Sequence, residues 1–373
     1  MRIGIDARMM GYGFGIARYE LELVKQLMEI DTDNTYVLFL RRENWDLLDL
    51  PANFSRVLAD ISWYSFEEQW RMPRIIRAAG VDLMHFPHWN VPLAYRSPFV
   101  LTIHDLIMYH FPRPQATTLG PFKFWMKDRI HRIVLKWAAH RARHILATSM
   151  FTKFDIMEHL GISDEHITVT YQAPFGRVSD DVVVQSALLK WGISTPYVLY
   201  VGSAYPHKNL ETLLDAWQLI EREDEHDLTL VLVGAESPFY ERLTALPSFS
   251  RLSRAVYTGF VTDAALEDLY TEASLLVHPS LYEGFGLTPL EALIRGIPVV
   301  AAAASCLPEV LGGAALYVDP TSPADIAAAI IRLSHDEAAR LEILGAARTE
   351  LARYSWRDLA EKTVRAYQHA VNG

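Results

Sequence analysis

Two glycines and a predicted helix start stand together after the apolar run Leu275 to Pro279, which has the pattern of a buried strand. Gly284 and Gly286 allow the backbone to approach a ligand closely, and Thr288 followed by Pro289 is a typical N-cap and first helical residue. A helix start presents free backbone N–H groups and the positive end of its dipole. The sequence therefore predicts a phosphate-binding loop here.

Two carboxylates accompany this loop, Glu283 inside it and Glu291 in the first turn of the predicted helix. Glu291 has two interpretations, because Thr288-x-x-Glu291 also matches a capping box that needs no ligand. Glu283 stands beside the two glycines without an obvious local partner. We therefore expect Glu283 to bind a ligand, and both interpretations of Glu291 stay open.

A cationic loop follows a second predicted strand, Tyr197 to Gly202. Lys208 precedes Asn209, which is a candidate cap for the amphipathic helix that begins at Leu210. Lys208 could reach a diphosphate as a point charge, or it could be a solvated surface lysine. Two loops in one half of the chain are suited to bind phosphate, which favours the interpretation that Lys208 binds a diphosphate.

The glycine-rich turn at residues 11–19 is a weaker signal, because such first turns occur in many Rossmann folds. A dinucleotide site would also want an acidic residue at the end of the second strand, where the chain has Arg41 and Arg42. No tyrosine has a lysine four residues later, which disfavours a sugar-nucleotide epimerase as well. A dinucleotide-dependent enzyme is therefore a weak alternative.

Short apolar runs alternate with segments of helical period along the chain, which is typical of parallel sheets covered by helices. The predicted strands are 2–6, 36–40, 83–86, 99–103 and 145–148 in the first half, and 197–202, 228–234, 255–258, 275–279, 298–301 and 316–318 in the second. Both halves are therefore predicted to be doubly wound α/β. Ligands bind beyond the carboxyl ends of strands in such sheets, which is where these loops lie.

A length of 373 residues exceeds what one core usually supports, so we expect two domains. The predicted domains are 1–175 and 176–355, with a last helix at about 356–373 that packs back on the first. Residues 1–175 carry 20 basic and 19 acidic side chains, whereas residues 176–373 carry 15 and 26. The first half is therefore the part that could meet an anionic surface.

The segment 121–144 concentrates basic charge, with seven Lys and Arg against one Asp, interleaved with Phe and Trp. It could lie on an anionic membrane, which would suit a lipid-linked acceptor, or it could be an ordinary outer helix that packs its apolar face inward. Nucleic acid is not an expected partner, because the net charge is −10 and no binding module is recognisable.

We expect a cytoplasmic protein that can also lie on the inner face of the membrane. Met1 leads directly into a predicted strand without a signal peptide, and no apolar run approaches the ~18 residues of a spanning helix. The single cysteine, Cys306, excludes internal disulfides and suits a reducing compartment.

Taken in order, these motifs resemble the GT-B fold, family 4 glycosyltransferases, a retaining group with two Rossmann-like domains that face each other across a cleft. The resemblance extends over almost the whole chain, through Gly15 to Tyr19, Thr102 to Leu106, Ala147 to Ser149, Tyr200 to Asn209, Tyr257 to Val261, Pro279 to Glu291 and Ser305 to Val310. Each piece alone is unspecific, whereas the ordered set is highly specific.

The resemblance implies three catalytic residues. Lys208 would neutralise the departing diphosphate, Glu283 would bind the donor sugar near the transferring centre, and His104 would meet the sugar from the opposite domain. Glu291 would hold the ribose hydroxyls. Further donor contacts would come from Gly202, Ser203, His207, Val261, Phe285, Gly286, Leu287 and Thr288.

The resemblance also places Gly13 and Gly15 beside the acceptor. One departure from the family pattern lies in the cationic loop, where many relatives carry an arginine between Gly202 and Lys208. This chain has Ser203 and His207 at those positions. His207 would replace the arginine only when protonated.

The implied activity is transfer of a hexose from a nucleotide-diphosphate sugar to a glycan or lipid-linked acceptor, with retention of anomeric configuration, in polysaccharide or glycolipid biosynthesis. GDP-mannose is the favoured donor, and UDP- and dTDP-sugars stay open. No metal or other cofactor is expected, because a lysine and a helix end can stabilise the leaving diphosphate. Asp31-Thr32-Asp33 matches a metal-binding pair, but it stands at the amino end of a strand and is predicted to be a turn.

Three other functions are compatible with the same fold. A phosphorylase would depend on free phosphate, a nucleotide-sugar hydrolase would need no acceptor, and a non-catalytic protein would bind the sugar nucleotide without turnover.

Overall fold

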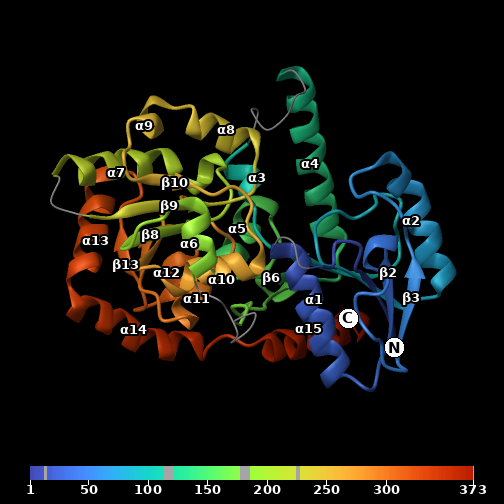
Figure 1. The fold of residues 1–373 in the computed structure, drawn as a ribbon. Coiled ribbons are helices and arrows are strands. Elements are labelled where there is room, and N and C mark those ends of the chain that lie inside the picture. The colour runs from blue at the N-terminus through green and yellow to red at the C-terminus, as the bar shows by residue number, and fades with distance from the viewer. Residues whose placement is uncertain (12–14, 113–120, 177–184, 224–226, 373) are drawn as a thin grey trace. The chain divides into compact units, whose positions relative to one another are not determined.

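The computed structural model describes residues 1–11, 15–112, 121–176, 185–223 and 227–372, which form two compact units (Figure 1). Unit 1 contains the chain up to Gln172 and the final segment from Ser355 onward. Unit 2 extends from Ala173 to Tyr354.

Unit 1 is built on a seven-stranded parallel sheet in the order β3-β2-β1-β4-β5-β6-β7. The strands are β1 (Arg2–Asp6), β2 (Thr35–Leu40), β3 (Phe54–Leu58), β4 (Leu83–Phe86), β5 (Phe99–Ile103), β6 (His144–Ala147) and β7 (Ile167–Val169). The sequence predicted five of them to within one residue at each end and missed β3 and β7. Both are outer strands with partly exposed residues, so they lack the continuous apolar run of a central parallel strand.

Two hydrophobic clusters cover the two faces of this sheet. Helices α1 (Gly15–Ile30) and α15 (Trp356–Asn372) pack side by side on one face, through residues such as Leu23 and Tyr367 (Figure 1). Helices α2 (Phe66–Ala79), α4 (Pro121–Arg141) and α5 (Met150–Leu160) pack on the other. The remaining elements are the short helix α3 (Ile107–His110) and the 3-10 turns η1 (Arg42–Asn44) and η3 (Asp164–His166).

Unit 2 repeats the architecture with six parallel strands in the order β10-β9-β8-β11-β12-β13. The strands are β8 (Tyr197–Val201), β9 (Thr229–Val233), β10 (Ala255–Tyr257), β11 (Leu275–His278), β12 (Val299–Ala302) and β13 (Leu316–Val318), all predicted to within one residue at each end. The helical elements are α6 (Gln185–Trp191), η4 (Pro206–Lys208), α7 (Leu210–Glu223), α8 (Pro238–Thr244), α9 (Pro247–Ser250), α10 (Asp263–Thr271), α11 (Leu287–Ile294), α12 (Leu307–Leu311), α13 (Pro323–His335) and α14 (Glu337–Leu351).

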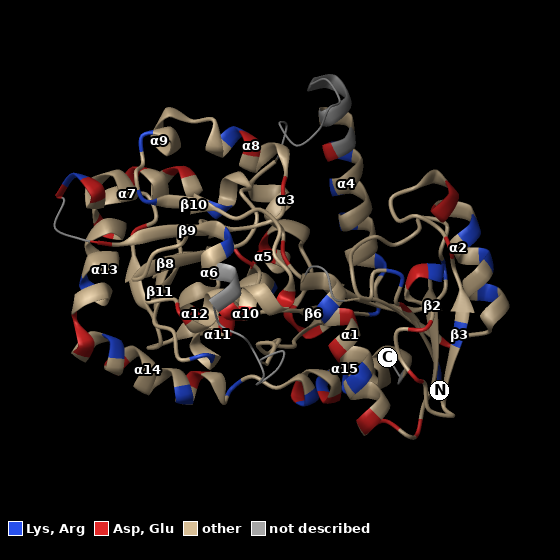
Figure 2. Cartoon of the chain, in the orientation of Figure 1, with Lys and Arg blue, Asp and Glu red and all other residues tan. Residues whose placement is uncertain are grey.

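Burial explains why these segments form strands. The central strands β9, β11 and β12 of unit 2 are buried along their whole length, and most of their side chains are apolar. Figure 2 shows the same division, with charged side chains gathered on the outer helices and few on the strands. The polar residues that follow the strands are therefore the ones available for chemistry.

Candidate active site

Each sheet has one point at which the strand order reverses. In unit 1 this point lies between β1 and β4, and in unit 2 it lies between β8 and β11. Ligands of open α/β sheets bind beyond the carboxyl ends of strands at such a point. In unit 2 the two loops that leave it carry Lys208 and Glu283, which the sequence had singled out separately.

Lys208 and Glu283 form an ion pair at the switch point of unit 2. Lys208 Nζ lies 2.6 Å from Glu283 Oε1, and the two side chains are 17% and 10% exposed. His278, the last residue of β11, donates from Nε2 to the same oxygen over 3.0 Å. Ser305 Oγ accepts the backbone N–H of Glu283 over 3.0 Å. The prediction that Glu283 lacks a local partner is therefore wrong.

These partners fix the charge of Glu283. Burial by itself would raise the pKa of this carboxyl, but the Lys208 ammonium and the His278 hydrogen bond together hold it well below its usual range. Glu283 is therefore ionised at neutral pH. An ammonium has three N–H donors, so Lys208 can hold Glu283 and still donate to a phosphate oxygen.

His278 is a site residue that sequence reasoning missed. Its Nδ1 atom is buried and has no hydrogen-bond partner within the described residues, while Nε2 is engaged by Glu283. The residue is the last one before Pro279, at the end of a predicted strand. That position at a carboxyl strand end was the available signal.

Helix α11 begins two residues earlier than predicted. Gly286 is its N-cap, in a left-handed conformation with φ 86°, and Leu287 is the first helical residue. A Cβ at Gly286 would stand 2.8 Å from Leu307 Cδ2, so both the backbone and the space require glycine. The prediction that Thr288 caps the helix with Pro289 in first position is therefore wrong.

This shift also removes the capping-box interpretation of Glu291. Thr288 lies inside the helix, so it cannot form the reciprocal cap with Glu291. The Glu291 carboxylate is partly buried, and its Oε2 accepts the Tyr270 hydroxyl over 3.5 Å. Glu291 is therefore positioned by tertiary contacts rather than by the helix start.

The cationic loop is held close to the sheet. Gly202 has φ 155°, and a Cβ there would stand 2.8 Å from the Tyr200 hydroxyl, which donates to the Ser203 carbonyl over 2.8 Å. Asn209 is left-handed with φ 61°, and its amide donates to the carbonyls of Pro279 and Pro320. The Asn209 side chain therefore ties the loop after β8 to the end of β11.

His207 is 1% exposed, and its ring stacks on Tyr205 with centroids 5.8 Å apart. Its backbone carbonyl accepts the N–H of Leu281 over 2.8 Å. Whether His207 replaces the family arginine stays a prediction.

Two other predicted donor contacts, Phe285 and Val261, differ in how far their side chains are buried. Phe285 is 4% exposed, and its ring packs edge-on against Tyr354. Val261 is partly buried and follows Phe260, whose ring is 72% exposed. The roles of both segments toward a base or sugar stay predictions.

His104 is in unit 1, at the carboxyl end of β5. Its Nε2 donates to the Pro87 carbonyl over 2.8 Å, and its ring meets Tyr19 edge-on at 4.7 Å. Burial lowers the pKa of His104 to about 4, even though the hydrogen bond to Pro87 acts in the opposite direction. The ring is therefore neutral at pH 7, with its N–H committed to Pro87 and Nδ1 unprotonated.

The predicted acceptor glycines lie at the start of α1. Gly15 is exposed and is the first helical residue, and Gly13 lies outside the described residues. At the other end of α1, the prediction of a turn at Asp31 to Asp33 is confirmed, because Asp31 Oδ1 accepts the backbone N–H groups of Asp33 and Asn34 before β2 begins.

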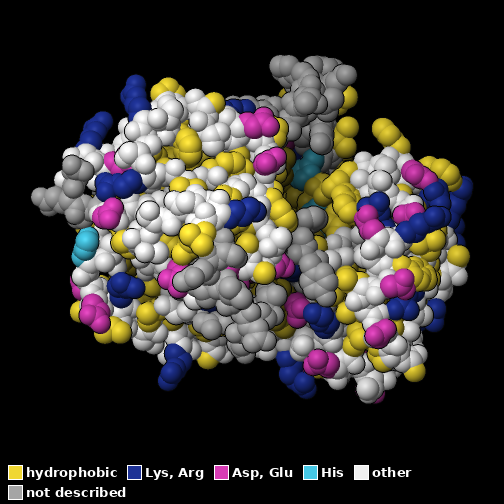
Figure 3. Space-filling view, in the orientation of Figure 1, with side chains coloured by type: hydrophobic (Ala, Val, Ile, Leu, Met, Phe, Trp, Pro, Cys, Tyr) yellow, Lys and Arg dark blue, Asp and Glu magenta, His cyan; other side chains and the backbone are white. Residues whose placement is uncertain are grey.

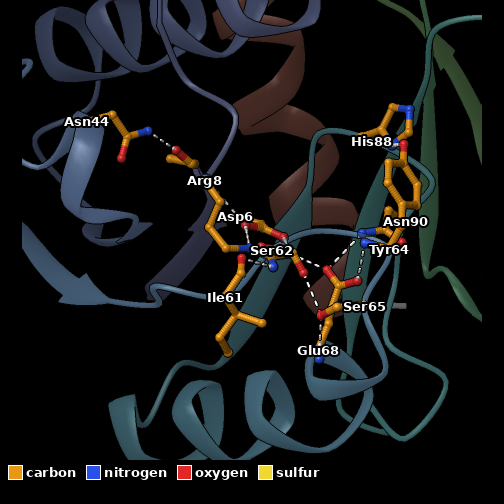
Figure 4. A network of polar contacts seen from close by, with 11 residues as sticks. Asp6, Arg8, Asn44, Ile61, Ser62, Tyr64, Ser65, Glu68, His88 and Asn90 are labelled. Carbon is orange, nitrogen blue, oxygen red and sulfur yellow. Dashed lines mark hydrogen bonds and ion pairs between the residues drawn. The ribbon is translucent and has the colours of Figure 1, made fainter.

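The switch point of unit 1 holds a buried ionic network that the sequence did not predict (Figure 4). Arg8 is 3% exposed and lies 2.7 Å from Asp6 Oδ2 and 2.5 Å from Glu68 Oε1. Its Nη1 donates to the Ile61 carbonyl, and Asn90 Nδ2 donates to Glu68 over 2.8 Å. These groups lie at the carboxyl ends of β1, β3 and β4 or in the first turn of α2, so only the fold brings them together.

A small cavity of about 10 Å³ adjoins this network, lined in part by Arg8, Glu20, Trp63, His88 and Asn90. Glu20 Oε2 is buried and has no hydrogen-bond partner within the described part of the chain. Burial, with a further contribution from Asp6, raises the pKa of the Glu20 carboxyl well above its ordinary value. The cavity has room for about one water-sized polar group.

Helix α4 carries the predicted basic segment. Its described outer face includes four exposed apolar side chains, Trp125 (54%), Met126 (45%), Ile130 (54%) and Ile133 (64%). Its inner face packs Leu135, Ala138 and Ala139 into the core. Figure 3 shows hydrophobic side chains beside the undescribed atoms at this helix. In the described part of α4, one apolar face therefore packs inward as an ordinary outer helix does, while further apolar side chains stay exposed, so the interpretation as a membrane-binding helix stays a prediction. Among the described helices, none is both long enough and apolar enough to cross a membrane.

Comparison with known proteins gives a consistent result. The model of "Glycosyltransferase Family 4" matches residues 15–173, and that of "Glycosyl transferases group 1" matches residues 190–350. The chain is 29% identical to O-antigen chain mannosyltransferase B of Escherichia coli, over 95% of this chain and 96% of that protein.

Solved structures show the same fold. Sucrose-phosphate synthase from Thermosynechococcus elongatus superimposes with a TM-score of 0.73 at 19% identity, over 98% of both chains. Anabaena HepE in complex with UDP-glucose superimposes with a TM-score of 0.71 at 17% identity, over 98% of this chain and 99% of that one. The fold is GT-B, and the protein is a glycosyltransferase. The chain belongs to the family 4, group 1 glycosyltransferases.

Proposed function

We propose that this glycosyltransferase moves a hexose, with mannose favoured, from a nucleoside-diphosphate sugar to a glycan or lipid-linked acceptor. The observation that carries the proposal is the Lys208–Glu283 ion pair at the switch point of unit 2. Glu283 stands three residues before Gly286, the N-cap of α11. It places a cation and free backbone N–H groups in one loop region, and both suit a diphosphate.

In the proposed reaction, the bond between the anomeric carbon and the diphosphate oxygen breaks, and the leaving diphosphate takes the electron pair. The acceptor oxygen bonds to the anomeric carbon on the same face that the diphosphate leaves, and its proton passes to the leaving phosphate oxygen. This same-face attack gives retention. Lys208 and the N–H groups of Leu287 and Thr288 stabilise the negative charge that builds up. Pro289 has no N–H, so these two amides are the first donors of α11.

Glu283 has a separate role in this proposal. As an ionised acceptor it receives hydroxyl groups of the donor sugar, and His278 keeps its carboxylate oriented. His104 contributes a neutral ring from unit 1, and Glu291 receives the ribose hydroxyls. No metal is needed for the transfer, because the cationic groups come from the chain.

The preference for mannose and for polysaccharide synthesis rests on sequence similarity. O-antigen chain mannosyltransferase B matches the chain nearly end to end. GDP-mannose is the proposed donor. UDP-glucose is the donor in the HepE complex, a much more distant relative, and UDP- and dTDP-sugars therefore belong in the test.

The acceptor is proposed to be glycan or lipid-linked, with peripheral contact to an anionic membrane through residues 121–144. Exposed Trp125, Ile130 and Ile133 stand among the exposed cations Arg129 and Lys136 on α4, as expected for an interfacial helix. Sedimentation with anionic vesicles tests this contact, since binding at low salt and release at high salt are expected. Absence of binding at low salt would remove the membrane contact and leave the transferase proposal intact.

A donor panel tests the function. Purified protein is incubated with GDP-mannose, UDP-glucose or a dTDP-sugar, with and without a glycan or polyprenyl-linked acceptor, and nucleoside diphosphate release is measured. We expect release to be fastest with GDP-mannose and to depend on the acceptor. Release that needs only water, or only free phosphate, would replace the proposal by a hydrolase or a phosphorylase.

A further inference from the structure

Three side chains with metal-ligating atoms meet in unit 1, outside the groups assigned above. His110 ends α3, and Asp155 and His159 stand one turn apart on α5. His110 Nε2 lies 2.9 Å from Asp155 Oδ1, and His159 Nδ1 lies 3.0 Å from the same oxygen. One ligand atom of each residue lies within 4.8 Å of the other two.

We propose that His110, Asp155 and His159 bind one divalent transition-metal ion of the zinc class. Two imidazole nitrogens and one carboxylate oxygen form a donor set that suits Zn²⁺, whereas Mg²⁺ and Ca²⁺ prefer oxygen ligands alone. The two imidazoles are 29% and 31% exposed, so an ion can enter from solvent, and water can supply a fourth ligand. Asp155 is 5% exposed, which shields its charge from solvent and leaves it facing the two rings.

Two of the three separations between ligand atoms are close to those of a metal site, and the third, between the two nitrogens, is at most 4.8 Å. With bonds of about 2.0–2.1 Å, tetrahedral ligand atoms lie ~3.3 Å apart. The two nitrogens lie 2.9 Å and 3.0 Å from Asp155 Oδ1, so a small outward movement of the rings admits the ion. Asp155 and His159 are four residues apart, so they share one face of α5 and their spacing is fixed by the helix.

The ion would join two elements that leave neighbouring strands. Helix α3 follows β5, helix α5 follows β6, and these strands are paired. The start of α5 already holds the carbonyl of His104, through Thr148 Oγ1 at 2.7 Å and Thr152 Oγ1 at 3.4 Å. A metal at His110 would therefore fasten the other end of the segment from His104 to His110. Its role is to brace this segment, and it takes no part in the transfer chemistry.

Zinc titration of the full-length, tag-free protein tests the site. After chelator treatment, calorimetry with Zn²⁺ alone is expected to show one equivalent per chain and a raised Tm, with no such effect from Mg²⁺. Asp155→Asn and His159→Gln are each expected to weaken Zn²⁺ binding by about tenfold or more. The matched control is His166→Gln, at a histidine 54% exposed on η3, which should bind like the wild type.

The alternative is a carboxylate that merely joins two imidazoles by hydrogen bonds. It predicts either no saturable Zn²⁺ binding above that of other exposed histidines, or equal Zn²⁺ binding by Asp155→Asn, His159→Gln and the control His166→Gln. Either result would overturn the site. Asp155→Asn keeps the side-chain size and one acceptor oxygen, and circular dichroism checks its fold. Co²⁺ in place of Zn²⁺ gives a visible spectrum of the coordinated ion in the wild type, which His110→Gln should abolish.

Discussion

The two sheets reverse at corresponding points, yet the loops there hold charge in opposite ways. In unit 2, Lys208 pairs with the single carboxylate of Glu283, and both side chains keep some exposure. In unit 1, the Arg8 side chain is 2% exposed and is held by Asp6 and Glu68 together with a backbone carbonyl. The proposed function therefore relies on N–H donors that Lys208 keeps beside its one carboxylate, whereas the guanidinium of unit 1 is already bound by two carboxylates and a carbonyl.

Replacement of Arg8 by methionine is expected to give the largest effect on stability. Arg8→Met leaves Asp6 and Glu68 buried without their cation, and loss of one partner of a buried pair typically costs about 3–5 kcal/mol. Urea denaturation measures the change in the free energy of unfolding.

The control is Arg357→Met on α15, whose pair with Glu361 is largely exposed, at 61% and 43%. Its loss should cost at most about 1 kcal/mol. If Arg8→Met costs no more than this control, the network at the switch point of unit 1 is not what holds its loops.

Lys208→Ala and Glu283→Ala should each lower turnover by about two orders of magnitude or more, while the protein stays folded. Removal of one donor aimed at developing charge typically costs ~2.7–4 kcal/mol of transition-state stabilisation. Steady-state kinetics with the preferred donor measure kcat and KM separately.

The matched controls are Lys25→Ala and Glu22→Ala, because these residues form a surface ion pair of 2.8 Å on α1. Neither control should change kcat. Near-normal turnover of Lys208→Ala would mean that the leaving diphosphate is stabilised elsewhere.

Two glycines with positive φ allow a finer comparison within unit 2. Gly286→Ala introduces left-handed strain of roughly 1–2 kcal/mol and places a Cβ 2.8 Å from Leu307 Cδ2, at the start of α11. Gly296→Ala introduces similar strain, at φ 75°, with no atom within 4 Å. Both variants should lose stability, but only Gly286→Ala should also raise KM for the donor. Equal KM values would argue against donor binding at the helix start.

The smallest expected effect is a change in the pH dependence of stability. The pKa of Glu283 is lowered in the folded protein, because Lys208 and His278 outweigh burial, so its contribution is fully present above the unfolded pKa of about 4.3. This contribution is lost as pH falls below that value and on through the folded pKa. Chemical denaturation between pH 3 and 7 should therefore show a shallower acid loss for Glu283→Gln than for the wild type. Parallel curves would contradict the assigned charge state.

The sequence predicted eleven of the thirteen strands in the described residues because buried parallel strands are continuous apolar runs. It missed the contacts between residues that are far apart in the sequence and meet only in the folded chain. Lys208 and Glu283 are 75 positions apart, and their pairing follows only from the adjacency of β8 and β11. The start of α11 was also misplaced, because a left-handed glycine displaced a threonine that local preference favours as cap.

The unit 1 network was beyond sequence reasoning for the same reason. Arg8 meets Glu68 across 60 positions, and neither stands in a recognisable motif. Asp6 ends the first strand and Arg8 stands two residues later, and this position at the carboxyl end of a strand was the available signal.

A crystal structure of the protein with its preferred nucleoside-diphosphate sugar tests the central claim most directly. We predict diphosphate oxygens within about 3 Å of both Lys208 Nζ and the backbone N–H of Leu287 or Thr288, with the sugar against Glu283. A diphosphate bound away from the β8–β11 switch point, with Lys208 still held by Glu283 alone, would contradict the account.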